Sequence, residues 1–146
     1  MHLARLLLVE DDVEIAEAFI EILTGEGYQV DHAANGAEGL NCLRTRSTPR
    51  LILLDWTMPV LNGPEMVRCM QREASWSRIP IVLLTAADEA KDKAIALRAS
   101  GYLKKPVDRD DLVRMVTAIV REPTTLRSTH PAVNGESSLH RLARRG

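Results

Sequence analysis

The chain has 146 residues, 45% of them apolar, and its 19 Lys and Arg side chains nearly balance 20 Asp and Glu, for a formal net charge of −1. This size and composition suit one globular domain with its own core and leave no room for a second full domain. The balanced charge excludes the strongly basic surface that would favour nucleic acid or an anionic membrane as the main partner.

The sequence carries no sign of a membrane segment, an export signal or a metal-binding cysteine pair. No apolar run is long enough to cross a bilayer, and the N-terminus lacks the basic start and apolar stretch of a secretory signal. Cys42 and Cys69 stand apart, without the close pairing or nearby His of a zinc or redox motif. We therefore expect a cytoplasmic protein whose two thiols are packing residues.

The first third of the chain alternates between strand and helix patterns. Residues 5–9 (RLLLV) are a continuous apolar run, typical of a strand buried on both faces of a parallel sheet. Apolar positions within 15–23 share one helical face, and two glycines then end that helix. Residues 28–33 (YQVDHA) alternate like a second strand. Asn35 with Glu38 has the spacing of a capping box and opens a second helix.

The same alternation continues through the middle of the chain. Residues 51–54 (LILL) and 81–84 (IVLL) are wholly apolar and are predicted as the third and fourth strands. A third helix is predicted over 63–72, between these two strands, and an Ala-rich fourth helix over 88–98.

The last predicted elements complete the domain at about residue 121. Residues 101–103 are assigned as a fifth strand mainly from their place in the order, and Asp108 caps a fifth helix with apolar residues over 112–119. Strands that alternate with helices indicate right-handed βαβ units and therefore an α/β fold with a parallel sheet. Residues 122–146 are rich in Pro, Thr, Ser, Asn and Gly, so we expect a flexible tail after a domain at 1–121.

Residues with chemical potential follow four of the five predicted strands. In an open α/β sheet, ligands bind beyond the carboxyl ends of the strands. The residues at those ends are Glu10, Asp11, Asp12, Asp55, Thr85, Lys104 and Lys105. Each has a plain structural explanation when taken alone, such as Asp12 capping the first helix. Together they predict a single polar site at one edge of the sheet.

The chemistry of this set points to a divalent cation and phosphoryl transfer. Like charges about 4 Å apart cost roughly 4 kcal/mol per pair at an effective dielectric near 20, so a fold that gathers Glu10, Asp11 and Asp55 must neutralise them. Mg²⁺, which prefers oxygen ligands, would do so with Asp11 as a direct ligand, and Lys105 supplies a second positive charge. An Asp between a metal and a Lys can attack phosphorus and form an aspartyl phosphate, so Asp55 is the predicted phosphoacceptor.

Four motifs resemble those of the receiver domain of two-component response regulators, over residue 3 to about 121. They are LLLVEDD (6–12), LILLDWTMPVLNG (51–63), IVLLTAA (81–87) and GYLKKP (101–106). The resemblance implies a flavodoxin-like domain with strand order 2-1-3-4-5. It also implies that a histidine kinase or phosphotransfer protein phosphorylates Asp55 in the presence of Mg²⁺.

The resemblance also implies a role for each matched residue. Glu10 and Asp11 match the acidic pair, Thr57 would offer its backbone carbonyl to Mg²⁺, Thr85 matches the switch hydroxyl, Tyr102 the switch aromatic and Lys105 the family's Lys. In such a switch the phosphoryl charge draws the Thr85 hydroxyl inward and Tyr102 rotates into the vacated space. The spacing from Thr85 to Lys105 is shorter than the family's usual one, so the fourth helix or the following loop should be shortened.

Three other functions fit the same residues less well. A Mg²⁺-dependent phosphohydrolase with an Asp nucleophile would need a second Asp where the chain has Thr57. A flavin or nucleotide carrier would need a Gly-rich loop where the first strand leads into three acids. A receiver-like interaction domain that is not phosphorylated would have no use for the acids and Lys105.

The expected behaviour is that of a phosphoacceptor, not an enzyme, which acts through protein partners. Upstream would be the kinase or phosphotransfer protein, and downstream an unknown protein. We expect no direct binding to nucleic acid or membrane, and a stand-alone regulator or shuttle for which homodimerisation stays open.

Overall fold

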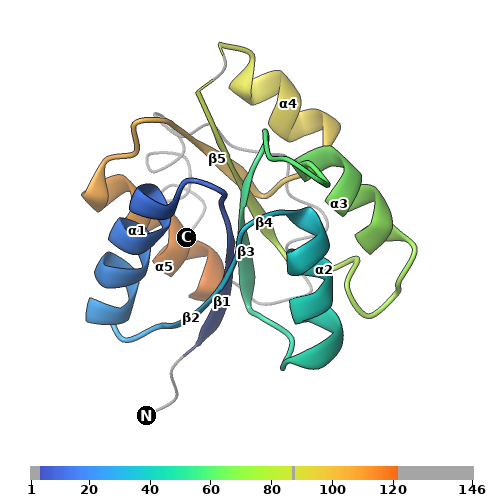
Figure 1. Cartoon of the computed structure of the whole chain (residues 1–146). Coiled ribbons are helices and arrows are strands. Elements are labelled where there is room, and N and C mark those ends of the chain that lie inside the picture. Colours follow the sequence, from blue (N-terminus) through green and yellow to red (C-terminus); the bar gives the residue numbers. More distant parts are fainter. Residues whose placement is uncertain (1–3, 87, 122–146) are drawn as a thin grey trace.

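The computed structural model describes residues 4–86 and 88–121, in which five strands alternate with five helices (Figure 1). The strands are β1 (Arg5–Val9), β2 (Gln29–Ala33), β3 (Leu51–Asp55), β4 (Ile81–Thr85) and β5 (Gly101–Lys104). The helices are α1 (Val13–Gly25), α2 (Gly36–Thr45), α3 (Gly63–Gln71), α4 (Ala90–Ala96) and α5 (Arg109–Arg121). The predicted tail at 122–146, and Ala87 of the third motif, lie outside the described residues.

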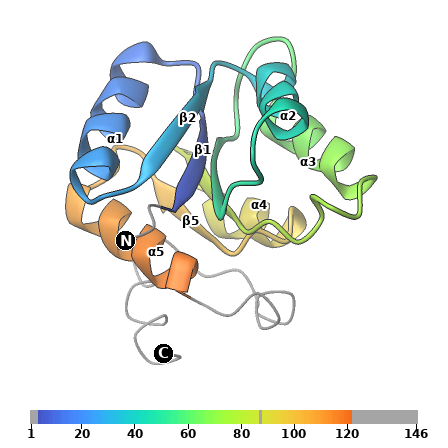
Figure 2. The ribbon, with the colours of Figure 1, turned by 90° about the horizontal axis from the view of Figure 1, so that it is seen from below.

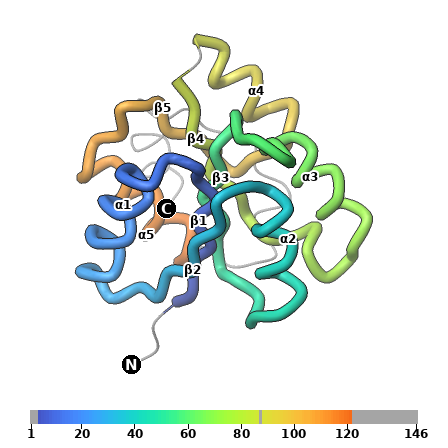
Figure 3. The backbone as a smooth tube through the Cα atoms, viewed as in Figure 1, coloured from blue at the N-terminus to red at the C-terminus, as the bar shows by residue number. Residues whose placement is uncertain are grey.

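The strands form one parallel sheet in the order β2-β1-β3-β4-β5. Each strand is followed by a helix before the chain returns to the sheet, as the tube in Figure 3 shows. Figure 2 shows the three layers that result, with α1 and α5 on one side of the sheet and α2, α3 and α4 on the other. The α/β class and the strand order expected from the sequence are confirmed.

Two hydrophobic cores flank the sheet because successive strand residues point to opposite faces. On the side of α2, α3 and α4 the central strands bury Leu7, Val9, Ile52 and Leu54. On the side of α1 and α5 they bury Leu6, Leu8, Leu51 and Leu53. A fully buried Leu or Val contributes roughly 1.5–3 kcal/mol, so the continuous apolar runs account for a two-sided sheet.

Side-chain caps fix the start of four helices close to the carboxyl ends of the strands. Asp12 accepts a hydrogen bond from the Ile15 amide at the start of α1. Asn35, Asn62 and Asp108 do the same for α2, α3 and α5. The caps predicted at Asn35 and Asp108 are confirmed, although the Glu38 carboxylate accepts from the Ala34 amide and not from that of Asn35.

Helix α4 is shorter at both ends than the predicted span of 88–98. Glu89 precedes it without a side-chain cap, and Arg98 has a left-handed backbone with φ 57°. The amides of Arg98 and Ala99 donate to the carbonyls of Ile95 and Ala94, which closes the helix in a Schellman motif. This closure ends the helix before residue 98, and the short α4 agrees with the expected shortening of this region.

The strands that carry site residues extend one residue further than their apolar patterns. Asp55, Thr85 and Lys104 are the last residues of β3, β4 and β5. Backbone pairing explains the extension, since Asp55 lies opposite Leu84 and Thr85 opposite Lys104. Within residues 4–86 and 88–121, no helix combines the length and the apolarity that crossing a bilayer requires.

Candidate functional site

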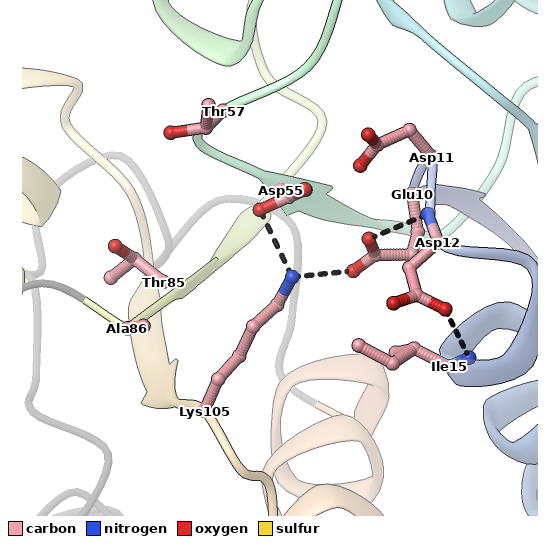
Figure 4. A pocket seen from close by; sticks show the side chains of 9 residues that line it. All are labelled: Glu10, Asp11, Asp12, Ile15, Asp55, Thr57, Thr85, Ala86 and Lys105. Atoms are coloured by element: carbon pink, nitrogen blue, oxygen red, sulfur yellow. Dashed lines mark hydrogen bonds and ion pairs between the residues drawn. The ribbon is translucent and has the colours of Figure 1, made fainter.

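A polar cavity of about 290 Å³ opens at the carboxyl edge of the sheet (Figure 4). Its lining comes from the segments at or just after the ends of β1, β3, β4 and β5. Seven of the residues expected at this edge line it: Glu10, Asp11, Asp12, Asp55, Thr57, Thr85 and Lys105. The convergence of strand ends, expected from the topology, therefore gathers these residues in one place.

Three carboxylates crowd the centre of this cavity. Glu10, Asp11 and Asp55 each offer an oxygen, and these atoms lie within 4.8 Å of one another. Glu10 and Asp55 are buried, whereas Asp11 is exposed. Burial next to like charge destabilises an ionised carboxylate, so this arrangement requires compensating positive charge.

Lys105 supplies part of that charge. Its Nζ atom lies 2.9 Å from Oε1 of Glu10 and 3.2 Å from Oδ1 of Asp55, so the ammonium stands between the two acids (Figure 4). The Lys105 amide donates to the Thr85 carbonyl, which ties this residue to the end of β4. Burial alone would lower the pKa of Lys105, but its contacts with Glu10 and Asp55 outweigh this effect and raise the pKa.

One ammonium is not enough to balance the acids. Burial, and then the negative charge of Glu10, raise the pKa of Asp55 from 3.8 to about 7, even though Lys105 acts in the opposite direction. A carboxyl group with such a pKa is only partly ionised near neutral pH. A further cation in the cavity would restore its ionised form.

The residues present fit a hard divalent cation. The Oε1 atom of Glu10 is buried, and the Lys105 ammonium is in ionic contact with it at 2.9 Å. Three carboxylates with oxygens this close together match the oxygen ligands that Mg²⁺ prefers. The cavity is therefore suited to Mg²⁺ on the chemistry of its donor atoms.

Three residues expected from the sequence are not part of the cluster of carboxylates and Lys105. Asp12 caps α1, and its amide donates to Oε2 of Glu10, so its plain structural explanation is confirmed. Lys104 does not line the cavity. Tyr102 also lies apart from the cavity, buried under α4 with Ala90 and Ala94. Tyr102 is buried in this structure, and its role as the switch aromatic stays a prediction.

Sequence reasoning missed one residue that supports the site. The His32 ring places Nε2 2.8 Å from the Glu10 carbonyl oxygen, and the Glu10 amide donates to Ala33. Both contacts fix the backbone of Glu10 against the end of β2. The parallel register, which sets Leu8 opposite His32, is the signal that could have placed this His beside Glu10.

The fold and the geometry of this cavity together define a receiver domain. The family model described as response regulator receiver domain matches residues 6–117, so the chain belongs to that family, whose members act in two-component systems. The resemblance and the function expected from the sequence motifs are confirmed at this level.

Relatives and solved structures support the same assignment. Protein PilH of Pseudomonas aeruginosa is 34% identical over 120 residues, which cover 81% of this chain and 98% of PilH. A putative response regulator of Chloroflexus aurantiacus has a TM-score of 0.78 at 29% identity, covering 83% of this chain and all of that one. The receiver domain of the Pseudomonas aeruginosa sensor histidine kinase PA1611, solved with a magnesium ion coordinated in its active site cleft, has a TM-score of 0.74 at 28% identity and the same coverage.

Several curated relatives are longer than the region that this chain matches. The matched region covers 60% of the transcriptional regulatory protein YcbL of Bacillus subtilis, at 36% identity over 139 residues. It covers 52% of the phosphate regulon regulator PhoB of Klebsiella pneumoniae, at 35% identity over 119 residues. The match to these regulators therefore concerns about half of their length.

Proposed function

We propose that the domain accepts a phosphoryl group on Asp55 and thereby switches its interactions with other proteins. The observation that carries this proposal is one buried carboxylate, Asp55, that lies beside the acidic pair and in ionic contact with the ammonium of Lys105. A carboxylate so placed has a nucleophilic oxygen and a cation beside it that can accompany the incoming phosphoryl oxygens. A phosphoacceptor of this kind reacts once per cycle and is not by itself a catalyst of substrate turnover.

The chemical step is an exchange of one phosphorus bond for another. An oxygen of ionised Asp55 attacks phosphorus and forms the acyl phosphate bond. The bond from phosphorus to the donor breaks, and its electron pair leaves with the donor, which is the imidazole of a phosphohistidine or the acetate of acetyl phosphate. Lys105 pairs with a phosphoryl oxygen, and the protein otherwise contributes orientation and charge compensation.

Mg²⁺ would be held by the carboxylates of Glu10, Asp11 and Asp55 together with the backbone carbonyl of Thr57. When bound, it supplies positive charge that offsets the carboxylates and the phosphoryl oxygens. The fit of this donor set rests on the short distances among the oxygens of the three acids and on the burial of Glu10 and Asp55.

Thr85 and Tyr102 would carry the change away from Asp55. Thr85 is buried at the end of β4 and lines the cavity, so its hydroxyl is near the place where phosphoryl oxygens would arrive. A phosphoryl group adds nearly two negative charges and three acceptor oxygens, which would draw that hydroxyl toward them. Tyr102, packed under α4, would adjust to the movement of Thr85 and alter the surface formed by α4 and α5.

The proposed partners follow from the family. A histidine kinase or a phosphotransfer protein would supply the phosphoryl group, and the partner that reads the phosphorylated state is a second protein. A receiver-like domain that is not phosphorylated is disfavoured, because crowding three acids around one ammonium has a free-energy cost that such a domain has no reason to retain.

The test is phosphorylation by a small donor. Incubation with Mg²⁺ and acetyl phosphate should add the mass of one phosphoryl group to the intact protein, and borohydride reduction followed by peptide mass spectrometry should locate it at Asp55. Asp55→Asn should gain no mass, whereas Asp92→Asn, which changes an exposed carboxylate on α4, should gain as much as the wild type. Equal labelling of the Asp55 variant would refute the proposed acceptor.

A further inference from the structure

A cation–π contact joins α4 to the residue that follows Asp55. The ammonium nitrogen of Lys93, on α4, lies 4.7 Å from the centre of the Trp56 ring. A cation within about 6 Å of an aromatic face is attracted to it, and the attraction grows as water is excluded. Both residues are half-buried, so the contact is partly shielded from solvent.

Backbone hydrogen bonds hold Trp56 in place directly after β3. The Trp56 amide donates to the Leu84 carbonyl on β4, and the Trp56 carbonyl accepts from the Gly63 amide at the start of α3. The indole packs against the core on the side of α2, α3 and α4. A displacement at Asp55 therefore reaches this ring through a single peptide bond.

Helix α4 has few other anchors. It has seven residues, no side-chain cap at its N-terminus, and only Ala90 and Ala94 fully buried. Two alanine side chains bury little apolar area, so they contribute little free energy to hold the helix on the sheet. The Lys93 stack on Trp56 is therefore one of the contacts that join α4 to the end of β3.

On the basis of the proposed function, we propose that the Lys93–Trp56 contact couples the occupancy of the acidic cavity to the position of α4. A bound cation or a phosphoryl group on Asp55 would shift this residue and, through the peptide bond to Trp56, the ring on which the Lys93 ammonium is stacked. Within residues 4–86 and 88–121, Lys93 forms no ion pair, so the Trp56 ring is the contact that places its ammonium. Lys93 is a positioning residue in this scheme.

Hydrogen exchange of the α4 amides tests the coupling. Exchange is measured for the wild type, Lys93→Met, Lys93→Arg and Lys91→Met, each with EDTA, with Mg²⁺ alone and with Mg²⁺ plus acetyl phosphate. Lys91 is the matched control, since it is an exposed Lys on the same helix. The intact mass of each sample reports its phosphoryl content independently.

The expected pattern separates coupling from a merely structural role. In the wild type and in Lys91→Met, the exchange rate of the α4 amides should differ between EDTA, Mg²⁺ and Mg²⁺ plus acetyl phosphate. Lys93→Arg should behave likewise, because a guanidinium also stacks on indole. Lys93→Met should exchange about two- to fivefold faster with EDTA and should lose most of the response to Mg²⁺ and to acetyl phosphate. The proposal is overturned if Lys93→Met retains the full response, or if α4 responds to neither ligand in the wild type. Absence of a mass gain would instead count against phosphorylation, while the Mg²⁺ response still decides the coupling.

Discussion

Replacing Asp55 by Asn should stabilise the metal-free protein, and the gain should grow with pH. At an effective dielectric near 20, two unit charges 4.8 Å apart repel by roughly 3 kcal/mol, and Asp55 has two acidic neighbours within this distance and one ammonium. The net result is the rise in the pKa of Asp55 from 3.8 to about 7. The protonated form is therefore the one that the folded state favours.

The sign of the pH dependence follows from linkage. Because the folded state holds the Asp55 proton more tightly than the unfolded chain, this group's contribution to stability is fully present below pH 3.8 and is lost as pH rises through about 7. The loss reaches up to about 4 kcal/mol at pH 8 and roughly 1–2 kcal/mol at pH 5. Asn is neutral at both values, so the advantage of Asp55→Asn should shrink by about half or more at pH 5.

Urea unfolding in EDTA at pH 8 and pH 5 measures this difference directly. Asp31→Asn is an informative control, since Asp31 is paired with Arg5 at 2.9 Å and Arg46 at 3.1 Å, and its loss should destabilise the protein. The reasoning about carboxylate crowding fails if Asp55→Asn is less stable than the wild type at both pH values, or if its advantage is the same at both.

Three further changes have defined outcomes. Mg²⁺ at 100 times its dissociation constant should raise the free energy of unfolding of the wild type by about 2.7 kcal/mol at pH 8, measured by thermal unfolding. The stabilisation of Asp11→Asn by the same Mg²⁺ concentration should be much smaller, and equal stabilisation would speak against Asp11 as a ligand. Lys105→Met should slow labelling by acetyl phosphate about tenfold or more in a mass-spectrometric time course, and an unchanged rate would remove Lys105 from the mechanism. Arg98→Gly should raise the free energy of unfolding, measured with urea, by about 0.5–1 kcal/mol, because glycine relieves the strain of a φ of 57°, whereas Arg98→Ala should not. Equal free energies of unfolding for both variants would contradict this.

The fold could be predicted because its determinants are local. The runs at β1, β3 and β4 are apolar on both faces, which only a sheet covered by helices on both sides accommodates. The identity of the cavity residues followed from the same pattern, since parallel strands bring Glu10, Asp55 and Lys105 to one edge wherever their order permits.

The remaining features depend on contacts between elements and left no local signal. The end of α4 is set by a left-handed Arg98, a position where the sequence offers no glycine. The contact of Lys93 with Trp56 and that of His32 with Glu10 depend on how far side chains reach across neighbouring elements. The raised pKa of Asp55 depends on how deeply the cavity is buried, which residue order alone does not state.

The position of Lys105 in the sequence determines when, during synthesis of the chain, the cavity gains its positive charge. Glu10 and Asp55 come from the first and third strands, while the ammonium between them follows the last strand of the sheet. During synthesis, the two acids leave the ribosome well before Lys105 does. A nascent or truncated chain that stops short of this residue would have to keep both carboxylates in water or protonated, so the charge balance of the pocket is reached only when the whole domain has been made.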